Sequence, residues 1–254
     1  MDDLISIIMP SYNTAAFIGD SIRSVLNQTY LNWELIIVDD CSTDNTDKVV
    51  SQFVDQRIKY LKNERNSGAA VSRNKALKEA QGEYVAFLDS DDLWQENKLE
   101  KQLKFMKINN YNFSYTDYER IDENGIRMNV RCTGPDIITK KKMYHYCYPG
   151  CLTVMYKREL FQELQINDIK KNNDYAMWLI ICKVYNCYLL KENLASYRVR
   201  KKSVSHDKLG RLIRSHYDLF RVCDNRSSLM SCWLACWNMW YGFWKKKKYE
   251  KRIN

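Results

Sequence analysis

The sequence predicts an α/β fold in which helices flank a mostly parallel central sheet. Short apolar segments alternate with amphipathic segments through the first hundred positions of the 254-residue chain. The connections between the apolar segments are too short for anything except crossover helices between parallel strands. The chain is also long enough to bury a sizeable core, and its 45% hydrophobic and 28% charged content is ordinary for a globular protein.

Three strands are expected in the first third of the chain, over residues 4–9, 33–38 and 58–61, because each is a short apolar run that ends at polar residues. One helix follows the first strand, and a second runs to about residue 54. The first of these helices places four apolar side chains on one face: Ile18, Ile22, Val25 and Leu26.

A fourth strand is expected over residues 84–88, with Gly82 ending the helix before it. Asp89, Asp91 and Asp92 follow within four positions. Carboxylates this close repel one another unless something positive lies beside them. Two carboxylates together with substrate phosphates commonly hold Mg²⁺, and Mn²⁺ accepts the same oxygens. Because open α/β sheets bind ligands beyond the carboxyl ends of their strands, the segment predicts a metal site, the alternative being an acidic turn that caps the next helix.

Asp39 and Asp40 end the second strand in the same way. A carboxylate there can accept hydrogen bonds from a base N–H or from ribose hydroxyls, or it can cap the helix near Thr43. Arg73 lies within the apolar stripe of the helix that follows Gly68. Since arginine is rarely buried unpaired, it needs an anion, either Asp39 or Asp40 or a bound nucleotide, although a purely structural Arg–Asp pair is an alternative.

Four segments carry a resemblance to a known family. They are PSYN at 10–13, DDCSTD at 39–44, NSG at 66–68 with Arg73-Asn74 behind it, and FLDSDD at 87–92. In this order and spacing they resemble the family 2 glycosyltransferases, which have the GT-A fold, a Rossmann-like fold of nucleotide-diphospho-sugar transferases. The resemblance implies a nucleotide-diphosphate-sugar donor, Mn²⁺ or Mg²⁺ as cofactor, and inversion at the anomeric carbon.

The resemblance also implies roles for individual residues. Asp91 is expected to be the principal metal ligand, with Asp89 beside the ribose and the metal. His206 is expected either to bind metal or phosphate or to be an exposed loop residue. The nucleotide-sugar site is expected to consist of Pro10, Tyr12, Asn13, Asp40, Arg73, Asp89 and Ser90.

The second half of the catalytic domain is expected to bind the acceptor. The sequence predicts a helix over residues 95–109 and half-exposed strands at 112–118 and 126–130. A further strand is expected at 150–155, followed by a helix from about Arg158. The last strand of the sheet is expected at 194–199.

A further helix begins near Asn173-Asp174 and places Trp178 on its apolar face. Asp174 by itself is compatible with a simple N-cap. In the resembling family an acidic pair stands here, and its second residue is the catalytic base, which corresponds to Asp174. Asn173 replaces the first acidic residue, so the role of that neighbour is in doubt.

The end of the chain has a different composition. A stripe of tryptophans, Trp233, Trp237, Trp240 and Trp244, is followed by Lys245–Lys248, Lys251 and Arg252. The apolar part, residues 229–244, is too short and too polar to span a membrane. The pattern is typical of a helix that lies in the membrane interface, or of one that packs on its own domain or on a second subunit as in a homodimer. We therefore expect a catalytic domain over 1–206, with halves 1–92 and 93–206, and a helical extension over 207–254.

Nine scattered cysteines and the acidic start of the chain indicate a cytoplasmic protein with reduced thiols, here expected at the inner face of the cell membrane. The predicted function is inverting transfer of galactose, glucose or N-acetylglucosamine from a UDP-sugar to a lipid-diphosphate-linked glycan, in bacterial surface polysaccharide synthesis of the O-antigen or capsule type.

Two other classes of function are weighed against this one. The net charge of +9 raises the possibility of a nucleic-acid-binding protein, but the basic residues concentrate in the last sixty positions, and acidic clusters mark the strand ends, so no nucleic acid partner is expected. A nucleotidyltransferase on a similar sheet requires a glycine-rich basic loop after the first strand, which residues 11–14 lack.

Overall fold

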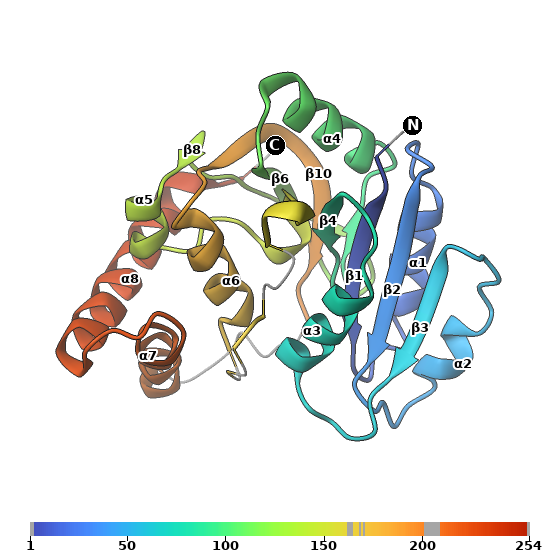
Figure 1. Cartoon of the computed structure of the whole chain (residues 1–254), viewed down its shortest axis with the longest axis horizontal. Helices are drawn as coiled ribbons and strands as arrows, with labels where there is room; N and C mark the ends of the chain where they lie inside the picture. Colours follow the sequence, from blue (N-terminus) through green and yellow to red (C-terminus); the bar gives the residue numbers. More distant parts are fainter. Residues whose placement is uncertain (1–2, 162–164, 168, 170, 201–208, 253–254) are drawn as a thin grey trace.

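The computed structural model describes residues 3–161, 165–167, 169, 171–200 and 209–252. Within them, parallel strands form one half of a mixed sheet, in the order β4 (Tyr84–Phe87), β1 (Ile5–Ser11), β2 (Trp33–Asp39) and β3 (Ile58–Lys62). The register aligns Ser11 with Asp39, so the polar residues that end the strands meet at one edge. The predicted parallel α/β arrangement is thereby confirmed for this half (Figure 1).

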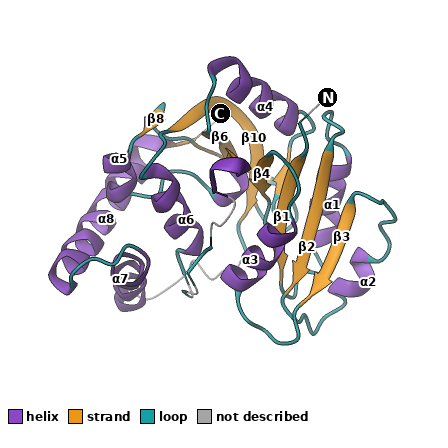
Figure 2. Cartoon of the chain, viewed as in Figure 1, coloured by secondary structure: helices purple, strands orange, loops and turns teal. Residues whose placement is uncertain are grey.

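Helices cover both faces of the sheet, as Figure 2 shows. On one face, α1 (Ile18–Leu26), α2 (Thr46–Val50) and α4 (Lys98–Asn109) bury their apolar side chains against Ile5, Ile7 and Met9 of β1. On the other face, α3 (Ala69–Glu79) and α6 (Asn173–Cys182) pack around Ile8. Alternate residues of β1 therefore supply two separate cores, as expected for a strand buried on both sides.

The second half of the chain extends the sheet with mostly antiparallel pairs. β6 (Phe113–Ile121) pairs with β9 (Met155–Lys157) and with β7 (Arg127–Cys132), and β9 joins them to β4. β10 (Cys187–Arg198) runs parallel to β6 and also pairs with two short strands, β5 (Leu93–Trp94) and β8 (Ile137–Ile138).

Three expected elements of this half are corrected. Cys151–Thr153 forms a short 3₁₀ helix, η1, instead of a strand over 150–155, because the Thr153 hydroxyl and backbone N–H both donate to the Gly150 carbonyl. A second 3₁₀ helix, η2 (Arg158–Phe161), occupies the start of the helix expected from Arg158, and residues 162–164 lie outside the described part. The strand expected at 194–199 belongs to the longer β10, and it is not the last strand of the sheet.

Gly82 serves the fold differently from the expected helix stop. α3 already ends at Glu79, with Ala80 as its extended C-cap. Gly82 instead lies against β1, where its N–H donates to the Ser6 hydroxyl at 2.8 Å. A Cβ at this position would lie 2.6 Å from the Leu4 carbonyl oxygen, so only glycine permits this close approach.

The C-terminal segment packs against α5 (Lys140–His145) and α6, and it adds a strand to the sheet. α7 (Leu209–Asp218), the π-helical turn η3 (Leu219–Cys223) and α8 (Ser228–Tyr249) lead into β11 (Glu250–Arg252), which pairs with β7. The expected boundary at 206/207 falls outside the described residues. Across the part of the chain that is described, every helix is too short or too polar to pass through a lipid bilayer.

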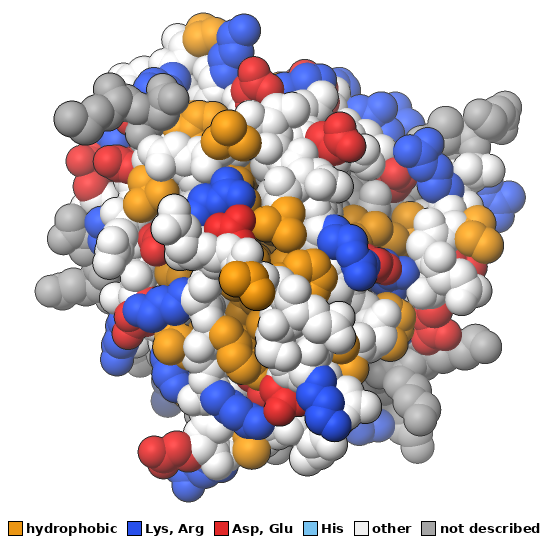
Figure 3. Space-filling model, turned by 90° about the vertical axis from the view of Figure 1, so that its right-hand side faces the viewer, with side chains coloured by type: hydrophobic (Ala, Val, Ile, Leu, Met, Phe, Trp, Pro, Cys, Tyr) orange, Lys and Arg blue, Asp and Glu red, His pale blue; other side chains and the backbone are white. Residues whose placement is uncertain are grey.

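Charges of both signs are interspersed with apolar side chains on the side of the molecule formed by α1, α2 and β3 (Figure 3).

Candidate active site

A cleft of about 690 Å³ lies beyond the carboxyl ends of β1, β2 and β4. Five segments that are distant in sequence line it, together with Asp40, Tyr118, Tyr197 and Arg200. These segments are residues 10–14, 66–73, 89–92, 150–152 and 171–174. The cleft brings together all the expected nucleotide-sugar residues except Asn13, and it also contains Asp91 and Asp174.

The acidic turn after β4 separates its three carboxylates. Asp89 and Asp91 face the cleft, and the Asp91 carboxylate pairs with Nε of Arg200 at 2.8 Å. Burial, followed by the neighbouring charge of Asp89, raises the pKa of Asp91 above its usual range. Asp92 is buried and its Oδ1 accepts the backbone N–H of Arg198 at 2.8 Å, so it anchors the end of β10.

Arg73 is the buried centre of the site. Its guanidinium donates to Oδ1 of Asp89 at 2.5 Å and to Oδ1 of Asn173 at 2.6 Å. The expectation that Asp39 or Asp40 supplies the anion is therefore wrong, because the side chain extends from α3 towards α6 and the β4 turn. Asn173, the residue whose role the sequence left in doubt, is the neutral partner of this arginine.

Asp39 and Asp40 each organise a loop. Asp39 accepts the backbone N–H of Ser42 at 3.2 Å and closes the turn after β2. Asp40 lines the cleft and accepts backbone N–H groups from Ser67 at 2.9 Å and Gly68 at 2.6 Å. Gly68 has φ of 90°, a conformation that glycine adopts without strain, so the loop reaches Asp40 and then starts α3.

Residues 10–13 lie at the end of β1 and directly after it, and only some of them line the cleft. Pro10 and Tyr12 line the cleft, and 46% of the Tyr12 side chain is exposed there. Asn13 is in the left-handed region with φ of 52°, and its Oδ1 accepts the backbone N–H of Thr43 at 2.8 Å. It therefore ties the first loop to the second. Ser90 is buried at the floor of the cleft.

Asp174 is the second residue of α6 and is half-buried at the cleft wall. The N-cap position belongs to Asn172, so the alternative role of Asp174 as a simple N-cap is wrong. Burial raises the pKa of the Asp174 carboxyl, and the charge of Arg73 opposes that rise. Trp178, one turn further on, is fully buried against Phe87 and Phe113, which makes it part of the core.

The donor set of the acidic turn fits a hard divalent cation. Within the described residues, histidine, cysteine, aspartate and glutamate side chains form no group of three or more that could enclose an ion. Asp89 and Asp91 therefore offer one or two carboxylates, which is how Mg²⁺ and Mn²⁺ are held when substrate phosphates complete the coordination. Two arginines, Arg73 and Arg200, balance these carboxylates. His206 lies outside the described residues.

Two residues that line the cleft were not among the expected site residues. Arg200 contacts Asp91, and Tyr118 lines the cleft from β6. Arg200 lies in the basic segment 198–206, and the resemblance of this segment to a family loop near the diphosphate was the available signal. Tyr118 sits in an alternating strand with no distinguishing neighbour.

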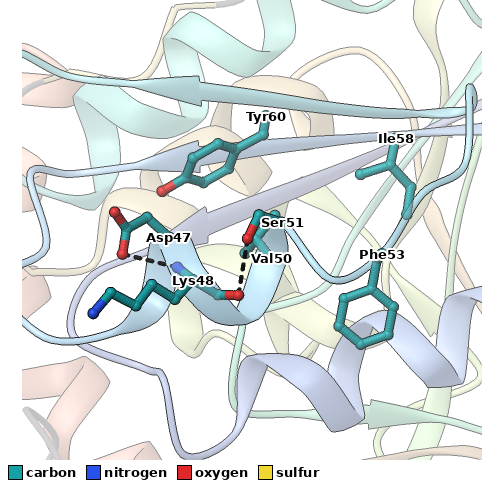
Figure 4. Close-up of a pocket in the computed structure, with 7 residues that line it drawn as sticks. All are labelled: Asp47, Lys48, Val50, Ser51, Phe53, Ile58 and Tyr60. Carbon is teal, nitrogen blue, oxygen red and sulfur yellow. Dashed lines mark hydrogen bonds between the residues drawn. The ribbon is translucent and has the colours of Figure 1, made fainter.

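A second hollow lies between α2 and β3 and is shown in Figure 4. Its polar groups bond locally, because Asp47 accepts the backbone N–H of Lys48 at 2.8 Å and the Ser51 hydroxyl donates to the Lys48 carbonyl at 2.9 Å. Apolar side chains, among them Phe53 and Ile58, form the rest of the wall. This hollow therefore offers no carboxylate cluster comparable to that of the cleft.

Comparison with known proteins identifies the family. Residues 6–186 match the model described as glycosyl transferase family 2. This chain belongs to family 2 of the glycosyltransferases. The enzyme is 45% identical over 208 residues to the putative teichuronic acid biosynthesis glycosyltransferase TuaG of Bacillus subtilis, covering 81% of this chain and 82% of that protein.

A second relative has a more detailed name. The UDP-Glc:alpha-D-GlcNAc-diphosphoundecaprenol beta-1,3-glucosyltransferase WfgD of Escherichia coli is 46% identical over 217 residues, covering 84% of this chain and 85% of that protein. Among solved structures, residues 1–349 of S. aureus TarS with UDP-GlcNAc match with a TM-score of 0.72 at 20% identity, covering 92% of this chain and 71% of TarS. The family 2 glycosyltransferase thus has the GT-A fold that its motifs predicted.

Proposed function

We propose that this glycosyltransferase moves a hexose, glucose being the first candidate, from a UDP-sugar to a hydroxyl of a lipid-diphosphate-linked glycan, with inversion at the anomeric carbon. The observation that carries the proposal is one cleft lined by Tyr12, Asp40, Asp91 and Asp174. WfgD, whose name states a UDP-glucose donor and a diphosphoundecaprenol-linked acceptor, supports the choice of substrates. The product would serve surface polysaccharide synthesis.

The residues of the cleft have separate roles in this proposal. Tyr12 and Asp40 hold the uridine end of the donor, and Asp89 and Asp91 hold a divalent cation. Family 2 transferases of this fold typically depend on such a metal, which neutralises the charge that develops on the departing nucleoside diphosphate. Mn²⁺ accompanies the fold neighbour PcManGT from Pyrobaculum calidifontis, which matches with a TM-score of 0.65 at 17% identity.

Asp174 acts as the general base. It accepts the proton of the acceptor hydroxyl while that oxygen attacks the face of the anomeric carbon opposite to the leaving diphosphate. A carboxylate suffices because the hydroxyl becomes acidic as the new C–O bond forms. Burial raises the pKa of Asp174, and the positive charge of Arg73 opposes that rise and so favours the ionised form of the carboxyl.

The Asp174→Asn variant tests this role. We expect turnover to fall about 10²- to 10⁴-fold, the usual contribution of a general base, with UDP affinity unchanged. Turnover is measured with radiolabelled UDP-glucose and a lipid-diphosphate N-acetylglucosamine acceptor, and affinity by calorimetry. Asp47→Asn, an equivalent change in the separate hollow of Figure 4, is the control and should keep full activity. An Asp174→Asn enzyme that transfers glucose at the normal rate would contradict the assignment.

We also propose that α8 holds the enzyme at the inner face of the cell membrane, where a lipid-linked acceptor resides. The buried side of α8 carries Ser231, Leu234, Ala235 and Asn238, so the tryptophan stripe faces outwards. Trp233, Trp240 and Trp244 are each at least 50% exposed, and the exposed lysines 246–248 follow them. Aromatic side chains beside basic residues suit the interface of an anionic membrane.

Vesicle sedimentation tests the membrane proposal. Vesicles of phosphatidylglycerol should bind the protein, and binding should weaken with added salt because each basic residue contributes about 1 kcal/mol electrostatically. The double change Trp233→Ala and Trp240→Ala should reduce binding, whereas Leu31→Ala, an exposed apolar residue elsewhere, should not. A protein that ignores vesicles and is dimeric through α8 would instead assign this face to a second subunit.

A further inference from the structure

A basic pocket of about 440 Å³ lies between α5 (Lys140–His145) and α8, apart from the catalytic cleft. Four lysines line it, Lys141, Lys142, Lys245 and Lys248, together with aromatic rings that include Tyr241 and Trp244. The described residues that line the pocket include neither aspartate nor glutamate. Its charge is therefore strongly positive, which suits an anionic ligand.

The pocket is distinct from the catalytic cleft, because no described residue that lines it also lines the cleft. Its wall comes mainly from α5 and α8, with Pro135 from the segment after β7. The cleft is instead formed by the loops after β1, β2 and β4 and by the start of α6. The ligand of this pocket would therefore occupy a different volume from the donor.

Lys245 is the unusual feature of the pocket. It is 8% exposed on the buried side of α8, and the ring of Tyr146 lies 5.0 Å from its ammonium nitrogen. Burial lowers the pKa of this lysine. Nearby groups, among them Glu250, which pairs with Arg120 at 2.8 Å, partly oppose this effect of burial. An anion bound in the pocket would add to that stabilisation of the charged lysine.

The rest of the pocket is preorganised on one side and adjustable on the other. His145 stacks on Tyr241 with 4.7 Å between ring centroids, and Lys142 donates to the Ile137 carbonyl at 2.8 Å. Lys141 and Lys248 are exposed at the rim, so their ammonium groups can close over a ligand. Stacked aromatic rings together with exposed ammonium groups suit a phosphate that carries an organic substituent.

Trp244 connects this pocket to the surface of α8. Its ring lines the pocket, yet half of it is exposed on the same face as Trp240. We propose that the pocket binds the phosphate of an anionic phospholipid headgroup while the aromatic face of α8 contacts the acyl region. This inference rests on the membrane contact proposed above, and it adds a specific headgroup site to that contact.

Titration with short-chain phosphatidylglycerol, below its critical micelle concentration, tests the site. The expected result is a saturable shift of the Trp244 indole N–H resonance, which the Trp244→Phe variant identifies. The double variant Lys141→Gln and Lys248→Gln should raise the dissociation constant at least about tenfold. The double variant Lys246→Gln and Lys247→Gln removes the same charge from exposed positions outside the pocket and should bind normally.

Several outcomes would overturn the proposal. Equal losses in the two double variants would show unspecific attraction by charge. An equal shift with short-chain phosphatidylcholine would show that the negative charge is not recognised, and an equal shift with glycerol 3-phosphate would assign the pocket to a free phosphate ester. Calorimetry with UDP and Mn²⁺ on the same variants separates the two proposals, because a failed headgroup site leaves donor binding intact and a failed donor site leaves the indole shift intact.

Discussion

The side chain of Arg73 links two parts of the cleft, the turn after β4 and the start of α6. It emerges from α3 and contacts Asp89 of the acidic turn after β4 and Asn173 at the start of α6. A neutral partner at position 173 leaves the arginine with one direct carboxylate contact, to Asp89. Its remaining charge acts on Asp174, the proposed base, and opposes the increase in pKa that burial causes.

The pH dependence of turnover should therefore respond to Arg73. In Arg73→Gln the pKa of Asp174 rises further, so less of the base is ionised at a given pH, and the acidic limb of kcat moves to higher pH. Arg73→Lys keeps the charge and should leave the limb in place, although turnover falls because a single ammonium cannot contact both partners as the guanidinium fork does. The pH profiles of the three enzymes check this. An unmoved limb in Arg73→Gln would mean that the arginine only supports the structure.

At the scale of elements, the role of a glycine depends on how closely another segment of the chain approaches it, which sequence periodicity does not reveal. Gly82 faces the backbone of β1, and Gly210 of α7 has open space where a Cβ would stand. The two glycines look alike in the sequence. Their difference comes from the distance between segments that lie about 76 positions apart in the chain.

We accordingly expect Gly82→Ala to lower the free energy of unfolding by about 1–3 kcal/mol, since the added methyl group forces β1 and the loop apart. Gly210→Ala, the matched control in an exposed helix, should be neutral or stabilising by up to about 1 kcal/mol. Urea unfolding measures both. A Gly82→Ala protein as stable as the unchanged chain would show that the loop relaxes without cost.

At the scale of the whole molecule, sequence reasoning worked best where local pattern and sheet geometry agree. Apolar periodicity predicted the four parallel strands and their helices. Because open α/β sheets bind ligands beyond the carboxyl ends of their strands, the sequence also predicted that Asp40, Asp89 and Asp91 lie together. It failed around Gly150, where local hydrogen bonds close a 3₁₀ turn inside an apolar run. It also failed to name the partners of Arg73, because they lie on two other parts of the fold: Asp89 on the turn after β4, and Asn173 at the start of α6, 100 positions away.

The C-terminal segment shows a related limit. Spacing predicted a tryptophan stripe, but only the packed structure shows which side of α8 is buried. Ser231 and Asn238, polar residues, occupy the buried side, while most of the tryptophans face outwards. Asn238 faces inwards because its amide donates to the Tyr175 hydroxyl at 2.6 Å, a partner that the sequence does not reveal.

The central claim is that the turn after β4 holds a divalent cation shared with a nucleoside diphosphate. Calorimetric titration of the protein with UDP tests it most directly, with Mn²⁺ present, with EDTA in its place, and with the Asp91→Asn variant. The account predicts binding at a single site that needs Mn²⁺ and that the variant loses. Equal affinity for UDP in EDTA, or an Asp91→Asn protein that binds UDP and Mn²⁺ normally, would contradict it.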